Sequence, residues 1–468
     1  MKVRMQKTSA EANDFPQRDR SATEWYEGVQ TFMWICEDNF VEVPFDKAHL
    51  LELILSPENL NRAYRVVVGN KGSGGIDKMS CEQLLPWLLA NKNELISSLL
   101  QGTYRPNPVR RVEIPKENGK TRLLGIPTVV DRLVQQAINQ ALTPIYERQF
   151  SKTSYGFRPK RSCHSALRKA QEIIESGYRY VVDLDLERFF DTVNHSKLIE
   201  ILSRTITDGR VVSLIHKYLS SGVIARGLFE AGAEGTPQGG PLSPLLSNIM
   251  LNELDKELEL RGHPFVRYAD DALIFCKSKR AAQRVKSSIT RFIEGKLFLK
   301  VNREKTVVSY VRGVKFLGYS FYVNKGQCLL AVHPKTKTKM KAKLKELTGR
   351  SNGWGYERRK QELKEYIRGW IGYYHLARIK RLCLETDEWL RRRIRMCIWK
   401  AWKKPKTRII NLKRCGIAAW QAYQWGNTRL GNWRISDSPI LARAISNENL
   451  KKAGYITLTD SYLEWYPK

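Results

Sequence analysis

Two acidic segments with β-strand character constrain the fold of this 468-residue chain more than any other feature. The first reads YRYVVDLDLERFFDTVNH over residues 178–195. Because side chains alternate between the two faces of a strand, Asp183 and Asp185 fall on one face and Leu184 and Leu186 on the other. Burying unpaired carboxylates costs free energy and raises their pKa, so we expect a cation to meet at least one of them. For this strand alone, a purely structural ion pair with Lys or Arg is an equal alternative.

The second acidic segment, HPFVRYADDALIFCK, spans residues 263–277. Two apolar runs flank Ala-Asp-Asp-Ala, which predicts a tight hairpin with Asp270 and Asp271 at its tip. A solvated Asp-Asp turn would explain this motif taken alone. A strand-borne Asp combined with a hairpin-borne pair, in a strongly basic chain, instead suits Mg²⁺ that also binds substrate phosphates. Two such ions would activate an attacking 3′-hydroxyl and stabilise a pyrophosphate leaving group.

Between the acidic segments lies EGTPQGGPLSPLLSNIMLNELDKEL, residues 234–258. We expect a glycine-rich loop followed by an apolar helix, with Ser243 as its N-cap and Pro244 as its first residue. Such a loop lets the backbone approach a nucleotide or template closely. An ordinary loop and helix start fits the same pattern.

The chain carries a formal net charge of +33, which favours a polyanionic partner such as nucleic acid. Residues 335–468 contain 32 Lys and Arg against 11 Asp and Glu, a net charge of +21, and nine of the twelve tryptophans. Cations interleaved with aromatic rings suit phosphates and unpaired bases. A solvated basic surface and aromatic helix cores are the alternatives.

Length and composition indicate several folding units, because single cores stop growing at roughly 250 to 300 residues. Residues 1–45 are polar and without a clear period, so we treat them as an extension of unknown role. Residues 105–334 alternate β-rich runs with helices, which indicates an α+β unit. At Lys335 the composition changes to a basic helical stretch, and Pro405 marks a further break.

The eight cysteines are scattered, without a CxxC pair or a Cys/His set at zinc spacing. We expect them to be reduced and mostly in the core. No apolar run approaches the roughly 18 residues of a membrane span, and the N-terminus lacks the apolar core of a secretory signal. We therefore expect a cytoplasmic protein without membrane partners.

These motifs, in this order, resemble the reverse transcriptases encoded by bacterial group II introns. The resemblance rests on YADD, the DLDLERFFD strand, TPQGGPLSPLLSNIMLNELD and the upstream RRVEIPKENGKTRLLGIPTVVDRLVQQAI. It runs from about residue 51 to the C-terminus. Within the family the chain is most similar to the class C type, which lacks a C-terminal endonuclease domain, and the absence of a Cys/His cluster agrees with that type.

The resemblance implies an α+β fold arranged as a right-hand polymerase, with fingers, a palm built on an antiparallel sheet, a helical thumb and a small basic C-terminal domain. The corresponding domains are the extension 1–45, fingers and palm 46–334, the thumb or maturase domain 335–404, and a DNA-binding domain 405–468.

The resemblance also assigns site residues. Asp185, Asp270 and Asp271 are implied as catalytic ligands of Mg²⁺, with Mn²⁺ as a substitute, whereas Asp183 precedes the family's metal-binding position by two residues and is left out. The implied substrate-binding residues are Lys116, Lys120, Arg122, Phe190, Gln238 and Lys305. Among them, Phe190 would screen the 2′ side of the sugar and Lys305 would donate a proton to pyrophosphate. Phe190 as ordinary core, and the fingers cations as a solvated hairpin, are the alternatives.

The implied function is that of an RNA-directed DNA polymerase that binds its group II intron RNA, assists splicing and copies the intron into DNA during retrohoming. Its partners would be intron RNA, an RNA template with a DNA primer, target DNA and deoxynucleoside triphosphates. One alternative is a splicing factor that uses the polymerase domain only as an RNA-binding scaffold. Another is a reverse transcriptase of a different retroelement or defence system.

Overall fold

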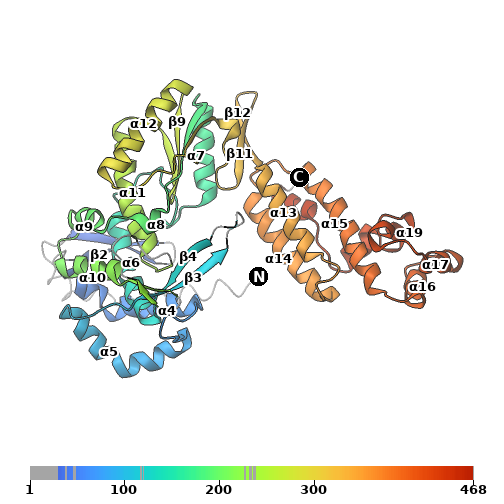
Figure 1. The fold of residues 1–468 in the computed structure, drawn as a ribbon, viewed down its shortest axis with the longest axis horizontal. Helices are drawn as coiled ribbons and strands as arrows, with labels where there is room; N and C mark the ends of the chain where they lie inside the picture. The colour runs from blue at the N-terminus through green and yellow to red at the C-terminus, as the bar shows by residue number, and fades with distance from the viewer. Residues whose placement is uncertain are drawn as a thin grey trace. The chain divides into compact units, whose positions relative to one another are not determined.

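The computed structural model describes residues 49–115, 119, 121–225, 228–230, 235 and 239–466, together with the strands formed by residues 30–36 and 39–45. The chain divides into two compact units, Met1–Tyr310 and Val311–Lys468 (Figure 1). Strands β1 (Gln30–Cys36) and β2 (Asn39–Phe45) pair antiparallel. Part of the segment 1–45, in which the sequence shows no clear period, therefore forms a β-hairpin.

The first unit contains a four-stranded sheet with the order β4-β3-β6-β7. Strand β3 (Val109–Pro115) pairs antiparallel with β4 (Thr121–Ile126) and parallel with β6 (Val223–Ala225), and β7 (Leu228–Glu230) completes the sheet. The helices of this part of the chain are α3 (Leu50–Ile54), α4 (Pro57–Gly69), the 3₁₀ turn η3 (Cys81–Gln83), α5 (Leu84–Leu100) and α6 (Val129–Glu147).

The second sheet of this unit has the order β10-β5-β9-β8, and all its strand pairs are antiparallel, as expected for a palm. Its strands are β5 (Tyr180–Leu184), β8 (Phe265–Tyr268), β9 (Asp271–Cys276) and β10 (Val307–Tyr310). Helix α12 (Lys279–Lys296) lies against β5, β9 and β10, and α7 (Cys163–Glu175) lies against β8. Val182, Leu184 and Leu186 join the hydrophobic core, as the alternation along the strand predicted. Three further helices complete this part: α8 (Phe189–Thr192), α9 (His195–Ser203) and α10 (Gly209–Ser220).

Helix α11 (Ser243–Leu260) begins one residue earlier than expected. Leu242 is its N-cap and already has helical dihedral angles, and its carbonyl accepts a hydrogen bond from the Leu246 N–H at 3.1 Å. Ser243 is therefore the first helical residue rather than the N-cap, and the side chain of the N-cap residue Leu242 makes no capping bond. Most of this helix is buried, so tertiary packing fixes where it begins.

The second unit starts with the turn η4 (Val311–Gly313) and a hairpin of β11 (Tyr319–Asn324) and β12 (Gln327–Val332). Three long helices follow: α13 (Pro334–Leu347), α14 (Tyr356–Tyr374) and α15 (Lys380–Ala401). Six short helices end the chain: α16 (Pro405–Arg414), α17 (Ala419–Gly426), α18 (Asn432–Ile435), α19 (Pro439–Ala444), α20 (Asn447–Lys452) and α21 (Leu458–Leu463).

The compact units do not divide at residue 334, where the composition changes. The hairpin joins the second unit because the Tyr319 hydroxyl donates to the Tyr373 carbonyl in α14, and the Tyr373 hydroxyl donates to the Leu317 carbonyl at 3.0 Å. Nor does a unit end at residue 404, since Asp387 in α15 accepts the Leu458 N–H of the terminal helix at 2.8 Å. These contacts define compact units and not functional domains, so the expected domain limits at 334 and 404 stay predictions.

Five of the seven cysteines that the structure describes are buried, as expected of cysteines that are mostly in the core. Among the described residues, no helix has the length and apolar character needed to cross a membrane.

Candidate active site

Asp185 directly follows the central strand β5 and is held through its backbone. The Thr306 hydroxyl accepts the Asp185 N–H and donates to the Asp185 carbonyl, both at 3.2 Å. The Asn302 N–H donates to the same carbonyl at 2.9 Å. Thr306 is fully buried, so these bonds are shielded from water and fix the position from which the carboxylate projects.

The Asp185 carboxylate meets a cation, as expected for this strand. The Lys305 ammonium lies 3.2 and 3.1 Å from its two oxygens. The Asp185 side chain is 29% exposed and that of Lys305 is 65% exposed. An ion pair this open to solvent contributes roughly 0 to 1 kcal/mol, so another cation can compete for the same oxygens.

The predicted Asp-Asp hairpin is present. Tyr268 pairs with Asp271, which leaves Ala269 and Asp270 as a two-residue turn. Ala269 has φ +58°, a region that costs a residue with a Cβ atom roughly 1 to 2 kcal/mol. The turn therefore needs support from its surroundings.

The strand register brings the two acidic segments together. Leu184 pairs with Ala272, so Asp185 and Asp271 occupy the next positions of neighbouring strands. Asp183 lies beside them: burial, followed by the nearby charges of Asp271 and Asp185, raises its pKa to about 6. Asp183 was left out of the expected metal set, although its place on the same strand face as Asp185 was the signal for its proximity.

The carboxylates can be tested against the requirements of a divalent ion. In the part of the chain that the structure describes, no three His, Cys, Asp or Glu side chains are arranged to hold a metal ion by themselves. Mg²⁺ in nucleotide-binding enzymes commonly takes one or two carboxylates and completes its octahedron with substrate phosphates and water. The neighbouring positions of Asp185 and Asp271 fit this mode of binding, in which the substrate supplies the remaining oxygens.

Several expected substrate-binding residues cannot be placed. Lys116, Lys120 and Gln238 lie outside the described residues. Arg122 belongs to β4, where its backbone pairs with Ile114, and its side chain is not among those described. The roles of these four residues stay predictions.

Phe190 stands between the core and an open cavity. Its ring packs edge-to-face on buried Phe189, with ring centroids 5.2 Å apart. It also lines a cavity of about 470 Å³ together with Phe157, Arg132 and Gly239. Phe190 thus packs against the core and also faces the cavity, so a sugar ring in the cavity would be within its reach.

Phe157 was missed by the sequence reasoning. It is exposed although it is a large apolar residue, and it has φ +58°. A phenylalanine held in this conformation at the wall of a cavity suits a contact with a flat ligand. The available signal was its place between Gly156 and Arg158, in a turn that keeps the ring away from the core.

Two segments of the chain match known protein families. Residues 114–321 match the family Reverse transcriptase (RNA-dependent DNA polymerase), and residues 337–416 match Group II intron, maturase-specific domain. Protein YkfC of Escherichia coli (strain K12) is 38% identical over 311 residues, which cover 58% of this chain and 82% of YkfC.

Two further relatives are longer than the matched region. Group II intron-encoded protein LtrA of Lactococcus lactis subsp. cremoris is 33% identical over 349 residues, covering 59% of this chain and 57% of LtrA. The putative COX1/OXI3 intron 2 protein of Saccharomyces cerevisiae is 26% identical over 435 residues, covering 73% of this chain and 50% of that protein. A solved structure, a partial Cas6-RT-Cas1–Cas2 complex, matches 52% of this chain at 25% identity with a TM-score of 0.34.

The family resemblance inferred from the motifs is thereby confirmed. The chain belongs to the reverse transcriptases encoded by group II introns, RNA-directed DNA polymerases that also carry a maturase domain.

Proposed function

We propose that this protein binds its own group II intron RNA, assists its splicing, and copies it into DNA at a target site in a Mg²⁺-dependent reaction. The observation that carries the proposal is the juxtaposition of Asp185 and Asp271 at neighbouring strand positions, with Asp270 in the adjoining turn. The likeness to LtrA, itself named as a group II intron-encoded protein, supports the choice of RNA. We place this activity in the bacterial cytoplasm.

The side chains of the proposed site would have different roles in nucleotide transfer. Asp185, Asp270 and Asp271 would hold Mg²⁺, or Mn²⁺ in its place, and the ions would neutralise phosphate charge and activate the primer hydroxyl. Lys305, whose ammonium lies 3.1 Å from Asp185, is within reach of phosphates bound there and would donate a proton to the leaving pyrophosphate. Phe190 would close the space beside the sugar 2′ carbon. Lys116, Lys120, Arg122 and Gln238 would contact the incoming deoxynucleoside triphosphate.

Intron RNA would bind the basic second unit. On α13 the buried face consists of Thr336, Met340, Leu344 and Leu347, while Lys335, Lys341 and Lys345 are exposed. The lysines can therefore contact a phosphate backbone while the opposite face of the helix stays packed. The maturase-specific match over residues 337–416 includes most of this helix.

Target DNA would bind the region 405–468. Trp420 and Tyr423 lie nearly one turn apart on α17 and are each 68% exposed. The adjacent helix α16 packs against α17 and ends with exposed Lys413 and Arg414. Exposed rings beside cations suit a nucleic acid strand with accessible bases.

The second candidate, a splicing factor with an inactive polymerase domain, finds less support. Such a protein has no need to keep its metal ligands, yet all three carboxylates are present at the strand end and hairpin turn. We therefore favour catalysis.

The test replaces both Asp270 and Asp271 by Ala. We expect primer extension on an RNA template to fall by at least about a thousandfold, because nothing else in the turn can hold an ion between primer and triphosphate. Intron binding and splicing should persist, since the proposed RNA contacts lie on α13. A variant with exposed Glu58 and Glu94 replaced by Ala controls for the loss of two negative charges. Retained extension would refute the metal assignment, and loss of both activities in a folded protein would refute the separation of binding from catalysis.

A further inference from the structure

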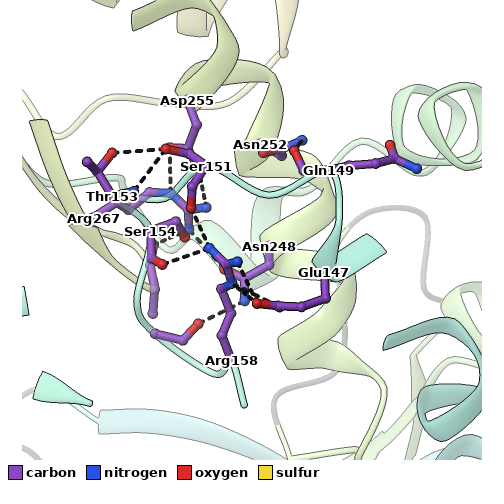
Figure 2. A network of polar contacts seen from close by, with 12 residues as sticks. Glu147, Gln149, Ser151, Thr153, Ser154, Arg158, Asn248, Asn252, Asp255 and Arg267 are labelled. Carbon is purple, nitrogen blue, oxygen red and sulfur yellow. Dashed lines mark hydrogen bonds and ion pairs between the residues drawn. The ribbon is translucent and has the colours of Figure 1, made fainter. Parts of the chain in front are cut away.

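A buried polar network joins the Asp-Asp hairpin to helix α11 (Figure 2). At its centre Arg267 of β8 is only 1% exposed. Its Nε and Nη2 groups donate to the two Asp255 oxygens at 2.8 and 2.6 Å. Its Nη1 group donates to the Asn248 side-chain oxygen and to the Ala269 carbonyl, both at 2.9 Å. One guanidinium therefore connects the turn directly to two residues of α11.

The same network reaches the segment 153–156. The Arg267 N–H donates to the Thr153 carbonyl at 3.0 Å, and the Tyr155 N–H donates to the Arg267 carbonyl at 2.8 Å. The Asn248 amide donates to the Gly156 carbonyl at 2.8 Å. Gly156 lies so close to the turn that a Cβ atom there would be 2.2 Å from the Ala269 nitrogen. The turn is thus enclosed by segment 153–156 on one side and held by Arg267 on the other.

A second buried arginine anchors the far end of this segment. Arg158 donates through Nε and Nη2 to Glu147, and through Nη1 to the Ser154 carbonyl at 2.8 Å. The exposed ring of Phe157 is the neighbour of Arg158 and lines the cavity that Phe190 also lines. The network therefore fixes both the hairpin turn and one wall of this cavity.

We infer that Arg267, Asn248 and Asp255 are positioning residues for the polymerase reaction, which fix the Ala269–Asp270 turn and thereby the placement of Asp271 beside Asp185. This inference deepens the proposed function and rests on it for the role of the carboxylates. The unfavourable φ of Ala269 requires a turn determined by its surroundings, and the Arg267 bond to the Ala269 carbonyl supplies that restraint. Asn248 completes it by bonding Arg267 and Gly156 together.

A general stabilising role for the network is the competing explanation. A buried ion pair such as Arg267–Asp255 adds little net stability compared with apolar residues of the same shape, which argues against stability as its main purpose. The two explanations differ in what a network variant should change. If the network positions the turn, a variant should change the Mg²⁺ dependence of the reaction and the hydrogen exchange of the turn. If the network only stabilises the fold, a variant should lower the melting temperature alone.

Helix α11 offers a matched pair of residues for the test. Asn248 and Asn252 lie one turn apart, are 1% and 4% exposed, and each donates to a backbone carbonyl, at 2.8 Å to Gly156 and 3.2 Å to Gln149. Only Asn248 is bonded to Arg267, and Figure 2 shows Asn252 beside Gln149, away from Arg267. Replacing either by Ala removes a buried amide from the same face of the same helix and leaves the Arg267–Asp255 pair in place.

Both full-length variants are compared with the unmodified protein by thermal unfolding, primer extension over a range of Mg²⁺ concentrations, and hydrogen exchange of the peptide covering residues 266–273. The loss of a buried hydrogen bond should shift the equilibrium between the fixed and the displaced turn about tenfold. Asn248→Ala should therefore lower kcat roughly tenfold, raise the half-saturating Mg²⁺ concentration several-fold and speed hydrogen exchange in the turn about tenfold. Asn252→Ala should also lower the melting temperature, although by less because it loses one hydrogen bond instead of two, and should leave these three quantities near those of the unmodified protein.

The outcomes are distinguishable. If the two variants agree in kcat, Mg²⁺ dependence and exchange, Asn248 is merely structural and the inference is overturned. Arg267→Lys, which keeps a cation for Asp255 but cannot form the fork, should reproduce the Asn248→Ala pattern in a protein that still folds. If the unmodified protein makes no DNA, the proposed function fails. Hydrogen exchange still decides whether Asn248 fixes the turn, because that measurement needs no activity.

Discussion

Asp183→Asn should stabilise the protein at neutral and alkaline pH, although it removes a charged residue from a sheet. Asp183 sits in the central palm strand, where its neighbours are Val307 of β10 and Leu273 of β9. Burial and the charges of Asp271 and Asp185 raise its pKa to about 6, whereas an unfolded Asp has a pKa near 3.8. The folded state therefore holds a proton that the unfolded state has already lost.

The size and sign of the effect follow from this difference in pKa. Well below pH 3.8 both states are protonated and Asp183 has no pH-dependent cost; the cost then grows to about 2 kcal/mol at pH 5 and about 3 kcal/mol at pH 8. Asn is uncharged and nearly the same shape, so the stability difference between variant and unmodified protein should grow by about 1 kcal/mol from pH 5 to pH 8.

The assay is urea-induced unfolding of both proteins at pH 5, 6, 7 and 8 with a chelator present. The chelator is needed because a bound cation would favour the charged form of Asp183 and hide the effect. A matched variant, Asp437→Asn, removes an exposed carboxylate and should show no such gain toward alkaline pH. A stability difference that stays constant or shrinks between pH 5 and pH 8 would refute the assigned cause.

Three further predictions concern substrate, metal and RNA. Phe190→Ala enlarges the cavity that Phe190 lines, so discrimination against ribonucleotides, measured in single-nucleotide extension, should fall by roughly tenfold or more, and unchanged discrimination would mean that Phe190 is ordinary core. Lys305→Met removes the cation that competes for Asp185, so Mn²⁺ binding measured by electron paramagnetic resonance should tighten by up to about fivefold, and weaker binding would contradict the competition. Replacing exposed Lys335, Lys341 and Lys345 of α13 by Gln should reduce the log–log salt slope of intron RNA binding by about two units, and an unchanged slope would show that these cations are merely solvated.

The local features of the site could be predicted from the sequence because each follows from a short pattern. Alternation along residues 181–186 placed the apolar side chains in the core, and the Ala-Asp-Asp-Ala run located the hairpin. The pairing of Asp185 with a cation followed from the cost of burying a carboxylate. The identity of that cation, Lys305, could not be predicted, since 120 residues separate it from Asp185, and the family resemblance implied Lys305 only as a proton donor to pyrophosphate.

The network around Arg267 could not be predicted, because in the sequence its acidic member looks like a residue of a solvated helix face. Asp255 lies in LNELDKEL, where an acid next to Lys and Glu is typical of a solvated helix face. In the structure it is fully buried against Arg267. The start of the second compact unit could not be predicted from composition either: composition changes at Lys335, but contacts of Tyr319 and Tyr373 decide where that unit begins.

The two acids of the β5 segment differ in role because of where the strand ends. Asp183 lies within the strand, paired on both sides, so its carboxylate is largely buried and no described ion pair reaches it. Asp185 lies past the last paired residue, and its oxygens are open enough to hold Lys305 or a metal ion. In the proposed metal site Asp183 would thus contribute negative potential rather than a ligand, and a cation bound at Asp185 would lower the pKa of Asp183 toward its ordinary value. Divalent ions should for this reason bind more weakly as pH falls through about 6.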